Sequence, residues 1–260
     1  MDNEINHNLL EDDFPQKITK TYNEIRRRFS LLHIDSLKVV QDVIKHRNYW
    51  KPDKVKTTLL AESHVYTPDN ENTIKIEYPE DEIFNDLPSN FVRLVYCLGY
   101  GENHLVTNII KNKGTPQYWK IFSACASDSE NFEFYKVSKT ETPNDIYRLK
   151  NKVSLLRKLR SKGVWLVDCS IVGLYNFGKT IGPNVLSEVL EYCWDNYIKS
   201  IIKKENPGHI VIIGKGVGGA ISRKLRIIGV DYTVLPQPQA RLSSEEHQEA
   251  LRQYQGICNR

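Results

Sequence analysis

Long apolar runs, a cysteine framework and a strong excess of one charge are all lacking in this sequence of 260 residues. The longest apolar runs, such as 210–213, fall far short of the roughly 20 residues that a membrane-spanning helix needs. The opening segment, 1–13, is acidic where a secretory signal would be basic, so we expect no targeting segment. With 40% hydrophobic and 26% charged residues, the composition is typical of a soluble globular protein.

The five cysteines are odd in number, widely spaced and without a CxxC motif. This usage argues against a disulfide framework, a zinc site and a cysteine-ligated iron–sulfur cluster. A reducing, cytoplasmic location is therefore expected, with no membrane partner. The sequence predicts neither a metal site nor a cofactor.

Positive charge is concentrated in two stretches, although the formal net charge is only +4. Segment 148–162 has seven basic residues and no acid, and segment 199–226 has seven more against Glu205 alone. Such runs usually form a solvated helix face. Two of them in one domain also indicate a polyanion partner, for which Arg157 and Arg160 are candidate contacts.

Apolar periodicity predicts an N-terminal helical segment, 1–54, followed by one α/β domain over 55–260. The domain's expected strands lie at 57–62, 164–170, 209–214 and 231–236, and its expected helices at 185–203, 217–228 and 244–254. This alternation predicts a three-layer α/β/α fold around a four-stranded parallel sheet. The stretch 73–142 is interrupted by Gly and Pro, and we expect moderate helix and long loops there, ordered at 90–100 and 117–126.

Two glycine motifs match phosphate-binding patterns. Segment 173–180 fits G-x-x-x-x-G-K-T, but Gly182 and Pro183 interrupt the helix that should begin there, which argues against an NTPase. Gly214, Gly216 and Gly219 fit G-x-G-x-x-G, but the acidic residue that should close the next strand is missing. No nucleotide cofactor is therefore expected. Backbone N–H groups at the second turn, with Lys215, would still suit a nucleic-acid phosphate.

Four segments at predicted strand ends follow one another in order: 59–64 (LLAESH), 163–168 (GVWLVD), 209–215 (HIVIIGK) and 234–242 (VLPQPQARL). They resemble motifs of the uracil-DNA glycosylase superfamily, in register over 55–255. The first resembles the strand and turn that hold the attacking water. The second is similar to the strand whose last residue reads the flipped base, and the third to the strand and turn that grip a DNA phosphate.

The fourth segment looks most like the second motif of the mismatch-specific and thymine-DNA glycosylase branch, where a loop after Pro carries a wedge that fills the gap left by the extruded base. Ser63 stands where many members have an Asp or Asn that polarises water, and His64 replaces a usual Pro. Leu235 replaces the histidine of uracil-specific members, which the mismatch branch also lacks. The resemblance implies a divergent member.

Asp168 occupies the place of an Asn that reads uracil in the superfamily. A carboxylate can only accept hydrogen bonds, so it would repel uracil O4 and accept from the N4 amino group of cytosine. The alternative is a strand-end Asp that binds a neighbouring turn. Together with the resemblance, base reading is favoured and predicts a cytosine-type base.

Glu62, Ser63 and His64 are the candidate catalytic residues. Glu62 at the mouth of the sheet can orient or deprotonate water and offset the positive charge of an oxocarbenium-like sugar. Its alternative is an exposed polar residue at a strand end. For His64 the alternative is a loop histidine with one local hydrogen bond.

The remaining candidates would contact the base or the DNA. The resemblance implies that Gln237 holds the flipped base with Asp168. Arg241, on the same loop as Gln239, has a planar head that suits insertion into a base stack. Gly214, Lys215 and Gly216 would bind a backbone phosphate.

The sequence thus predicts a monofunctional DNA glycosylase that binds double-stranded DNA and hydrolyses the N-glycosidic bond of a flipped base. Plain cytosine is an implausible target because the cell's own genome contains it everywhere. A 5-modified cytosine, such as the glucosylated hydroxymethylcytosine of phage DNA, and a role in antiviral defence are therefore implied. The alternatives are a non-catalytic nucleic-acid-binding module on the same fold, a uracil or mismatch repair glycosylase, and a nucleotide-binding protein that uses the glycine motifs.

Overall fold

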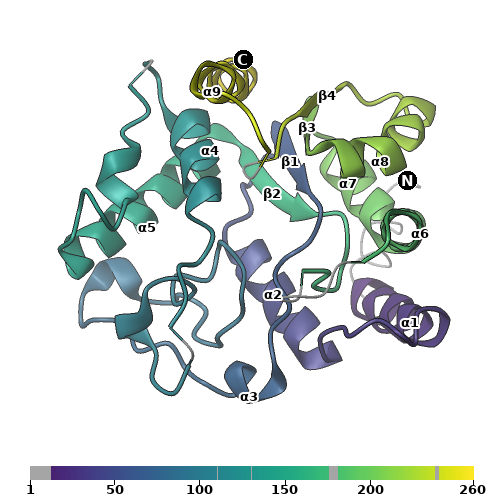
Figure 1. The fold of residues 1–260 in the computed structure, drawn as a ribbon, viewed down its shortest axis with the longest axis horizontal. Coiled ribbons are helices and arrows are strands. Elements are labelled where there is room, and N and C mark those ends of the chain that lie inside the picture. The colour runs from purple at the N-terminus through teal and green to yellow at the C-terminus, as the bar shows by residue number, and fades with distance from the viewer. Residues whose placement is uncertain (1–12, 110, 130, 176–180, 238–239) are drawn as a thin grey trace, which may run out of the picture.

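A sheet of four parallel strands in the order β2-β1-β3-β4 forms the centre of the molecule (Figure 1). The computed structural model describes residues 13–109, 111–129, 131–175, 181–237 and 240–260. Its strands are β1 (Thr57–Ala61), β2 (Val164–Asp168), β3 (His209–Ile213) and β4 (Tyr232–Leu235). All four predicted strands are confirmed, each one or two residues shorter than expected.

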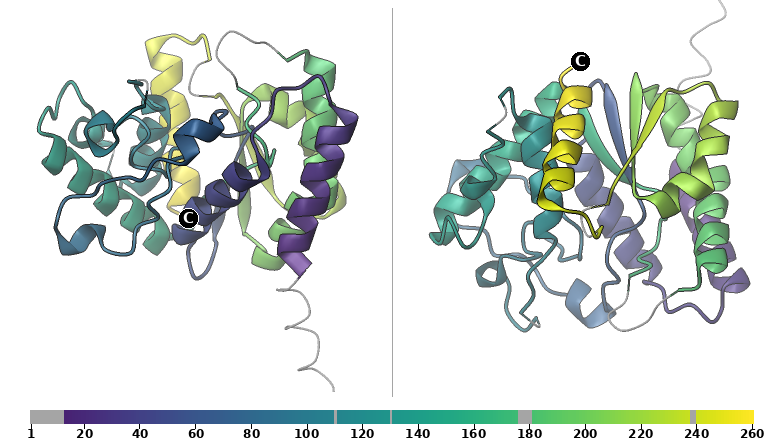
Figure 2. Two further views of the ribbon diagram at one scale, coloured as in Figure 1. Left: turned by 90° about the horizontal axis from the view of Figure 1, so that it is seen from below. Right: turned by 45° about the horizontal axis from the view of Figure 1, so that its top comes forward.

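Helices cover both faces of this sheet, as Figures 1 and 2 show. One layer contains α4 (Pro116–Ala126), α5 (Asp145–Lys162) and α9 (Ser244–Cys258). The other contains α6 (Pro183–Cys193), the π-helical turn η5 (Trp194–Ile198), α7 (Lys199–Glu205) and α8 (Lys215–Ile227). The expected three-layer α/β/α fold is thus confirmed. Because helices cover both faces, β1 and β2 are buried along their whole length.

The N-terminal helices share the core of the sheet domain. They are α1 (Asp13–Arg28), which packs against α6 and η5, and α2 (Leu37–Tyr49). Apolar residues such as Ile25 and Val40 are fully buried in the same cluster as the strands. The Arg47 carbonyl of α2 accepts a hydrogen bond of 3.0 Å from the Trp165 indole of β2. The helical segment is therefore packed as part of one unit with the sheet.

In the described part of the stretch between β1 and α5, which leaves out residues 110 and 130, the elements besides α4 are short. These are α3 (Asp69–Asn72), η2 (Glu82–Phe84), η3 (Asn103–Leu105) and η4 (Phe134–Val137). Segment 90–100, expected to be ordered, is well packed but forms successive turns rather than a helix. Its backbone bonds run from Cys97 to Leu94 and from Tyr100 to Cys97, and Gly101 follows with a φ of 100°, which a side chain would disfavour.

None of the helices in the described ranges is long and apolar enough to cross a membrane. All five cysteines are buried free thiols.

Candidate functional site

A cavity of about 630 Å³ lies at the carboxyl ends of the strands, the usual place for a ligand in an open parallel sheet. All five predicted catalytic and base-binding residues line it: Glu62, Ser63, His64, Asp168 and Gln237. The register explains part of this convergence, because Ala61 at the end of β1 pairs with Asp168 at the end of β2. Glu62 therefore emerges beside Asp168.

The second wall of the cavity comes from the loop-rich stretch between β1 and α5. It includes Arg93, Tyr100, Lys113, Thr115, Gln117 and Tyr118. Tyr118 is half-buried at the start of α4, and its phenol pKa is raised by burial and then by the negative charges of Asp168 and Glu62. Sequence reasoning missed Tyr118, because an aromatic residue in a segment with no clear periodicity gives no sign of what it faces.

His64 is completely buried and lies between two carboxylates. Its Nε2 is 3.0 Å from Asp35 Oδ2, and its Nδ1 is 3.8 Å from Asp168 Oδ2. Burial by itself would lower the imidazole pKa, but Asp35 and Asp168 outweigh it and raise the pKa to about 9. His64 is therefore a cation at neutral pH. The alternative of a loop histidine with one local bond is wrong, since Asp35 is 29 residues away in the chain.

Asp168 is buried, and its Oδ2 has no hydrogen-bond partner among the described residues. Seven buried side-chain polar atoms in the described part of the chain lack a partner, and three of them belong to residues that line this cavity: His64 Nδ1, Thr115 Oγ1 and Asp168 Oδ2. Buried polar atoms are rarely left unsatisfied in a folded protein. Their concentration here indicates that a polar ligand or water forms the missing hydrogen bonds in the cavity.

Glu62 and Ser63 stand at the mouth of the same cavity, both half-buried. Burial raises the pKa of Glu62 above its usual 4.5, and the charge of Asp168 raises it further. A carboxylate with a raised pKa is a stronger base toward water. The Ser63 hydroxyl oxygen accepts from the Leu174 backbone N–H at 3.1 Å, which leaves its own hydrogen available to a water or substrate oxygen.

The charge on His64 predicts a pH-dependent stability. Its pKa is about 9 in the folded protein against an ordinary 6.5, so the folded state binds the proton more tightly than the unfolded state does. This contribution, on the order of 3 kcal/mol, is fully present below pH 6.5 and is lost as the pH rises through 9. Urea unfolding at several pH values should show this loss in the wild type and not in His64→Gln. Parallel curves for the two proteins would contradict it.

The glycine turn after β3 lies next to the cavity. Gly214 has a φ of 98°, and a Cβ there would stand 3.3 Å from both Cβ and Oε1 of Gln237. The turn opens α8, in which Lys215 and Gly216 are exposed and nothing lies within 4 Å of a Cβ built on Gly216. The predicted phosphate-binding turn is thus open on its outer side, at the positive end of a helix of 13 residues.

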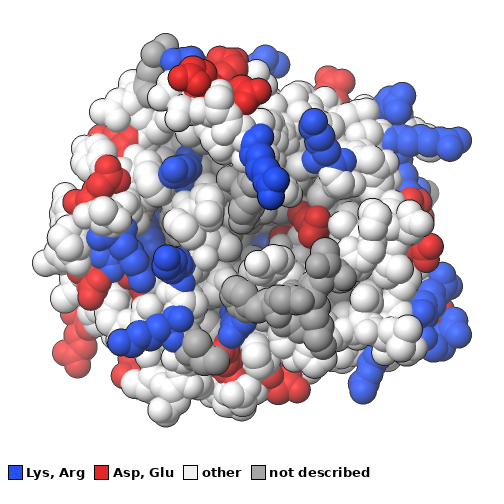
Figure 3. Space-filling view, in the orientation of Figure 1, with Lys and Arg blue, Asp and Glu red and all other residues white. Residues whose placement is uncertain are grey.

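The basic side chains of α5 form hydrogen bonds and ion pairs with other groups of the protein. All seven cations of α5 have intramolecular partners: Arg148 and Lys152 pair with Glu102, Lys150 with Asp81, Lys158 and Lys162 with Asp128, Arg160 with Asp53, and Arg157 with the Ile83 carbonyl. On the face seen in Figure 3, Lys and Arg are spread among Asp and Glu rather than gathered in one patch. Arg157 and Arg160 are exposed, so their contact with DNA stays a prediction for experiment.

Arg241 is exposed on the connection between β4 and α9. Gln239 lies outside the described residues, as do 176–180 of the first glycine motif. Within that motif Gly173 is described, and its backbone N–H donates to Asp35. Part of the motif therefore supports the buried carboxylate.

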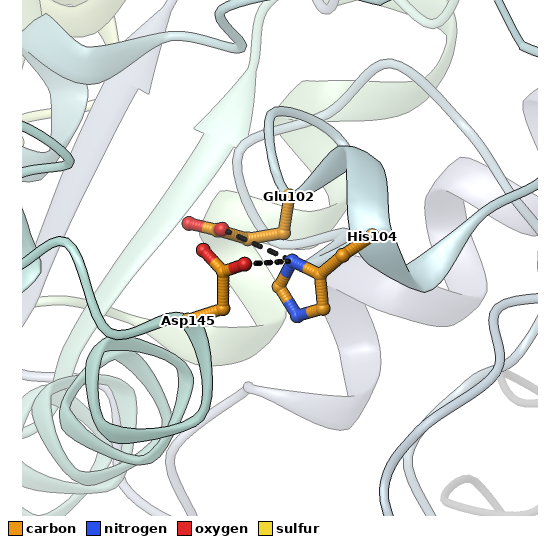
Figure 4. Close-up of side chains that lie close together, drawn as sticks. All are labelled: Glu102, His104 and Asp145. Carbon is orange, nitrogen blue, oxygen red and sulfur yellow. Dashed lines mark ion pairs between the residues drawn. The ribbon is translucent and has the colours of Figure 1, made fainter.

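A second group of titratable side chains, none of which lines the cavity, consists of Glu102, His104 and Asp145 (Figure 4). His104 Nδ1 lies 3.8 Å from Glu102 and 3.6 Å from Asp145. Burial alone would raise the pKa of Glu102, but hydrogen bonds and charges from Arg148 and Lys152 lower it to about 2. Because Arg148 and Lys152 already pair with these carboxylates, we do not assign the group to a metal.

No protein-family model matches the sequence, and a search of the curated proteins finds no match. The resemblance to uracil-DNA glycosylases therefore stays a prediction from the four sequence segments.

Proposed function

We propose that this protein is a DNA glycosylase that flips a base into the cavity and hydrolyses its N-glycosidic bond. One observation supports this most: the buried Asp168 Oδ2 has no hydrogen-bond partner in the described structure and faces a cationic His64 at 3.8 Å. The site thus offers a charged acceptor inside a cavity of about 630 Å³, within the size range of small-molecule sites.

The acceptor favours a base with an amino group. Asp168 can accept from N4 of cytosine but would face O4 of uracil in repulsion. Gln237 at the rim can contribute both a donor and an acceptor to the same base. The half-buried ring of Tyr118 offers an apolar face on which a flipped base can stack.

The chemistry is assigned to Glu62 and Ser63. Water held by these residues forms a bond to the sugar C1′ while the N-glycosidic bond breaks and its electron pair leaves with the base. Glu62 takes the proton of the attacking water, and its negative charge stabilises the oxocarbenium-like sugar. Such a reaction needs no covalent link to the enzyme, so the product is an abasic site and the free base.

The cell's own genome contains cytosine everywhere, so an enzyme that removed plain cytosine would damage it. The proposed target is therefore a 5-modified cytosine of foreign DNA. The lining of the cavity also includes polar side chains of its second wall, among them Thr115 and Gln117. These groups can meet a polar substituent on C5, such as the glucosyl group of glucosylated hydroxymethylcytosine. The biological role proposed on this basis is defence against phage.

The turn at Gly214–Gly216 is proposed to bind a DNA phosphate beside the flipped nucleotide. Lys215→Ala should weaken binding to all sequences and reduce the salt dependence of the affinity by roughly one unit of slope. The double change Arg157→Ala with Arg160→Ala serves for comparison, because these side chains have partners of their own. Titrations at several salt concentrations measure both. An unchanged slope for Lys215→Ala would remove this residue from the DNA interface.

The decisive experiment compares matched duplexes that carry uracil, a thymine mismatch, cytosine or several modified cytosines. After incubation with the protein, alkali treatment cuts the strand wherever a base has been released. Cleavage confined to one or more modified cytosines supports the proposal. Cleavage at uracil or at the mismatch points to a repair glycosylase, and binding without any cleavage points to a non-catalytic module.

A further inference from the structure

The N-terminal segment contacts His64, a residue of the cavity lining, through Asp35, which lies between α1 and α2. This residue is 1% exposed, and its carboxylate is held from three sides. Asp35 Oδ1 accepts from the Thr67 backbone N–H at 2.6 Å, and Oδ2 accepts from the backbone N–H of Gly173 and contacts His64 Nε2 at 3.0 Å. Thr67 lies in the connection that follows β1, and Gly173 lies in the connection that follows β2. Asp35 therefore holds these two connections together.

His64 links Asp35 to Asp168. Its two ring nitrogens face different carboxylates, and the three side chains are at most 4% exposed. The contact of Nε2 with Asp35 fixes the orientation of the ring and so directs Nδ1 toward Asp168 Oδ2.

We propose that Asp35 and His64 are positioning residues, which hold the Asp168 carboxylate in one orientation for the incoming base. This inference rests on the proposed function and extends the site into the N-terminal segment. The raised pKa of His64 agrees with it, because both carboxylates favour the protonated ring.

Other titratable groups also face this array, and any pH profile has to account for them. Glu62 and the phenols of Tyr96 and Tyr118 lie near enough to Asp168 to exchange electrostatic effects with it, and Cys169 follows it directly. Tyr22 and Tyr66 stand in the same relation to Asp35. The pKa values of these phenols are raised by burial, so they stay neutral in the range where His64 titrates.

The test begins with the titration of His64 followed by NMR, which needs no substrate. In the wild type the imidazole should titrate near pH 9, and in Asp35→Asn and in Asp168→Asn at least one unit lower. The signal is assigned by its loss in His64→Gln, and His209→Gln is the control. A wild-type value at or below 6.5, or a value unchanged by Asp35→Asn, overturns the inference even if a variant folds poorly.

The second readout is kcat/KM for base release against pH. In the wild type the alkaline limb should follow His64, and in Asp35→Asn it should move to lower pH by the same interval as the NMR value. With a wild-type pKa of about 9, a shift of one unit lowers the ratio of activity at pH 8.5 to that at pH 6.5 by about threefold. A structural role would lower activity equally at all pH values and would overturn the positioning role. The proposed function is tested independently of this positioning role. It fails if the wild type releases no base from any duplex.

Discussion

Glu62→Gln should lower the rate of base release by a factor on the order of 10² or more. The amide keeps the shape of the side chain but cannot take a proton from water, and it lacks the charge that stabilises the sugar in the transition state. Affinity for DNA should stay nearly unchanged, because this charge is needed mainly in the transition state. Single-turnover release and equilibrium binding, measured on the same duplex, separate the two effects.

The matched control is Glu80→Gln, which changes an exposed glutamate that does not line the cavity. It should behave as the wild type does. Because burial and Asp168 raise the pKa of Glu62, the wild-type rate should decline on the acid side at a pH above the usual 4.5. Turnover of Glu62→Gln at the wild-type rate would remove Glu62 from the catalytic role.

Asp168→Asn should reverse the base preference. It replaces one carboxylate oxygen by an N–H donor, which meets the cytosine amino group unfavourably, so excision of cytosine-type bases should fall. A site built around a hydrogen bond rejects the wrong partner strongly, by as much as about 10⁴-fold, because a buried polar group is left unpaired. Uracil excision should appear or rise, although Leu235 offers no support to its leaving anion.

Both activities are measured for the wild type and Asp168→Asn on duplexes that differ only in the target base. Asp231→Asn is the control, since it makes the same chemical change at an exposed position before β4. A merely structural Asp168 predicts loss of both activities through damaged folding. If Asp168→Asn keeps the wild-type preference, the carboxylate does not read the base and the cytosine assignment fails.

The charge distribution bears on how the protein would hold DNA. The sequence pattern of α5 suggests a basic binding face, yet Arg148 and Lys152 are buried with Glu102. Its other cations also contact groups far along the chain, which are acids except for the Ile83 carbonyl bound by Arg157. The turn at Lys215 and the exposed Arg241 lie on the side of the sheet that carries the cavity loops. We therefore propose that DNA binds mainly on this side of the sheet. The salt dependence of the DNA affinity of Lys215→Ala tests this proposal.

The sequence by itself determined the strands, the parallel sheet and the convergence of Glu62, Ser63, His64, Asp168 and Gln237. Apolar, β-branched runs such as 164–168 are readable because both faces of a central parallel strand are buried. Once the strands are parallel, residues at their carboxyl ends must meet at one edge of the sheet. Local pattern and this rule of geometry suffice for that part of the site.

Only the tertiary structure decided which side chains complete the site. Asp35 meets His64 across 29 residues, and Glu102 meets Arg148 across 46, through loops whose course follows from packing and not from periodicity. The protonation of His64 likewise depends on Asp35 and Asp168, whose charges outweigh the effect of burial and which lie far from His64 in the chain. The same holds for Tyr118, since the face that an aromatic residue presents depends on how its helix packs beside the sheet.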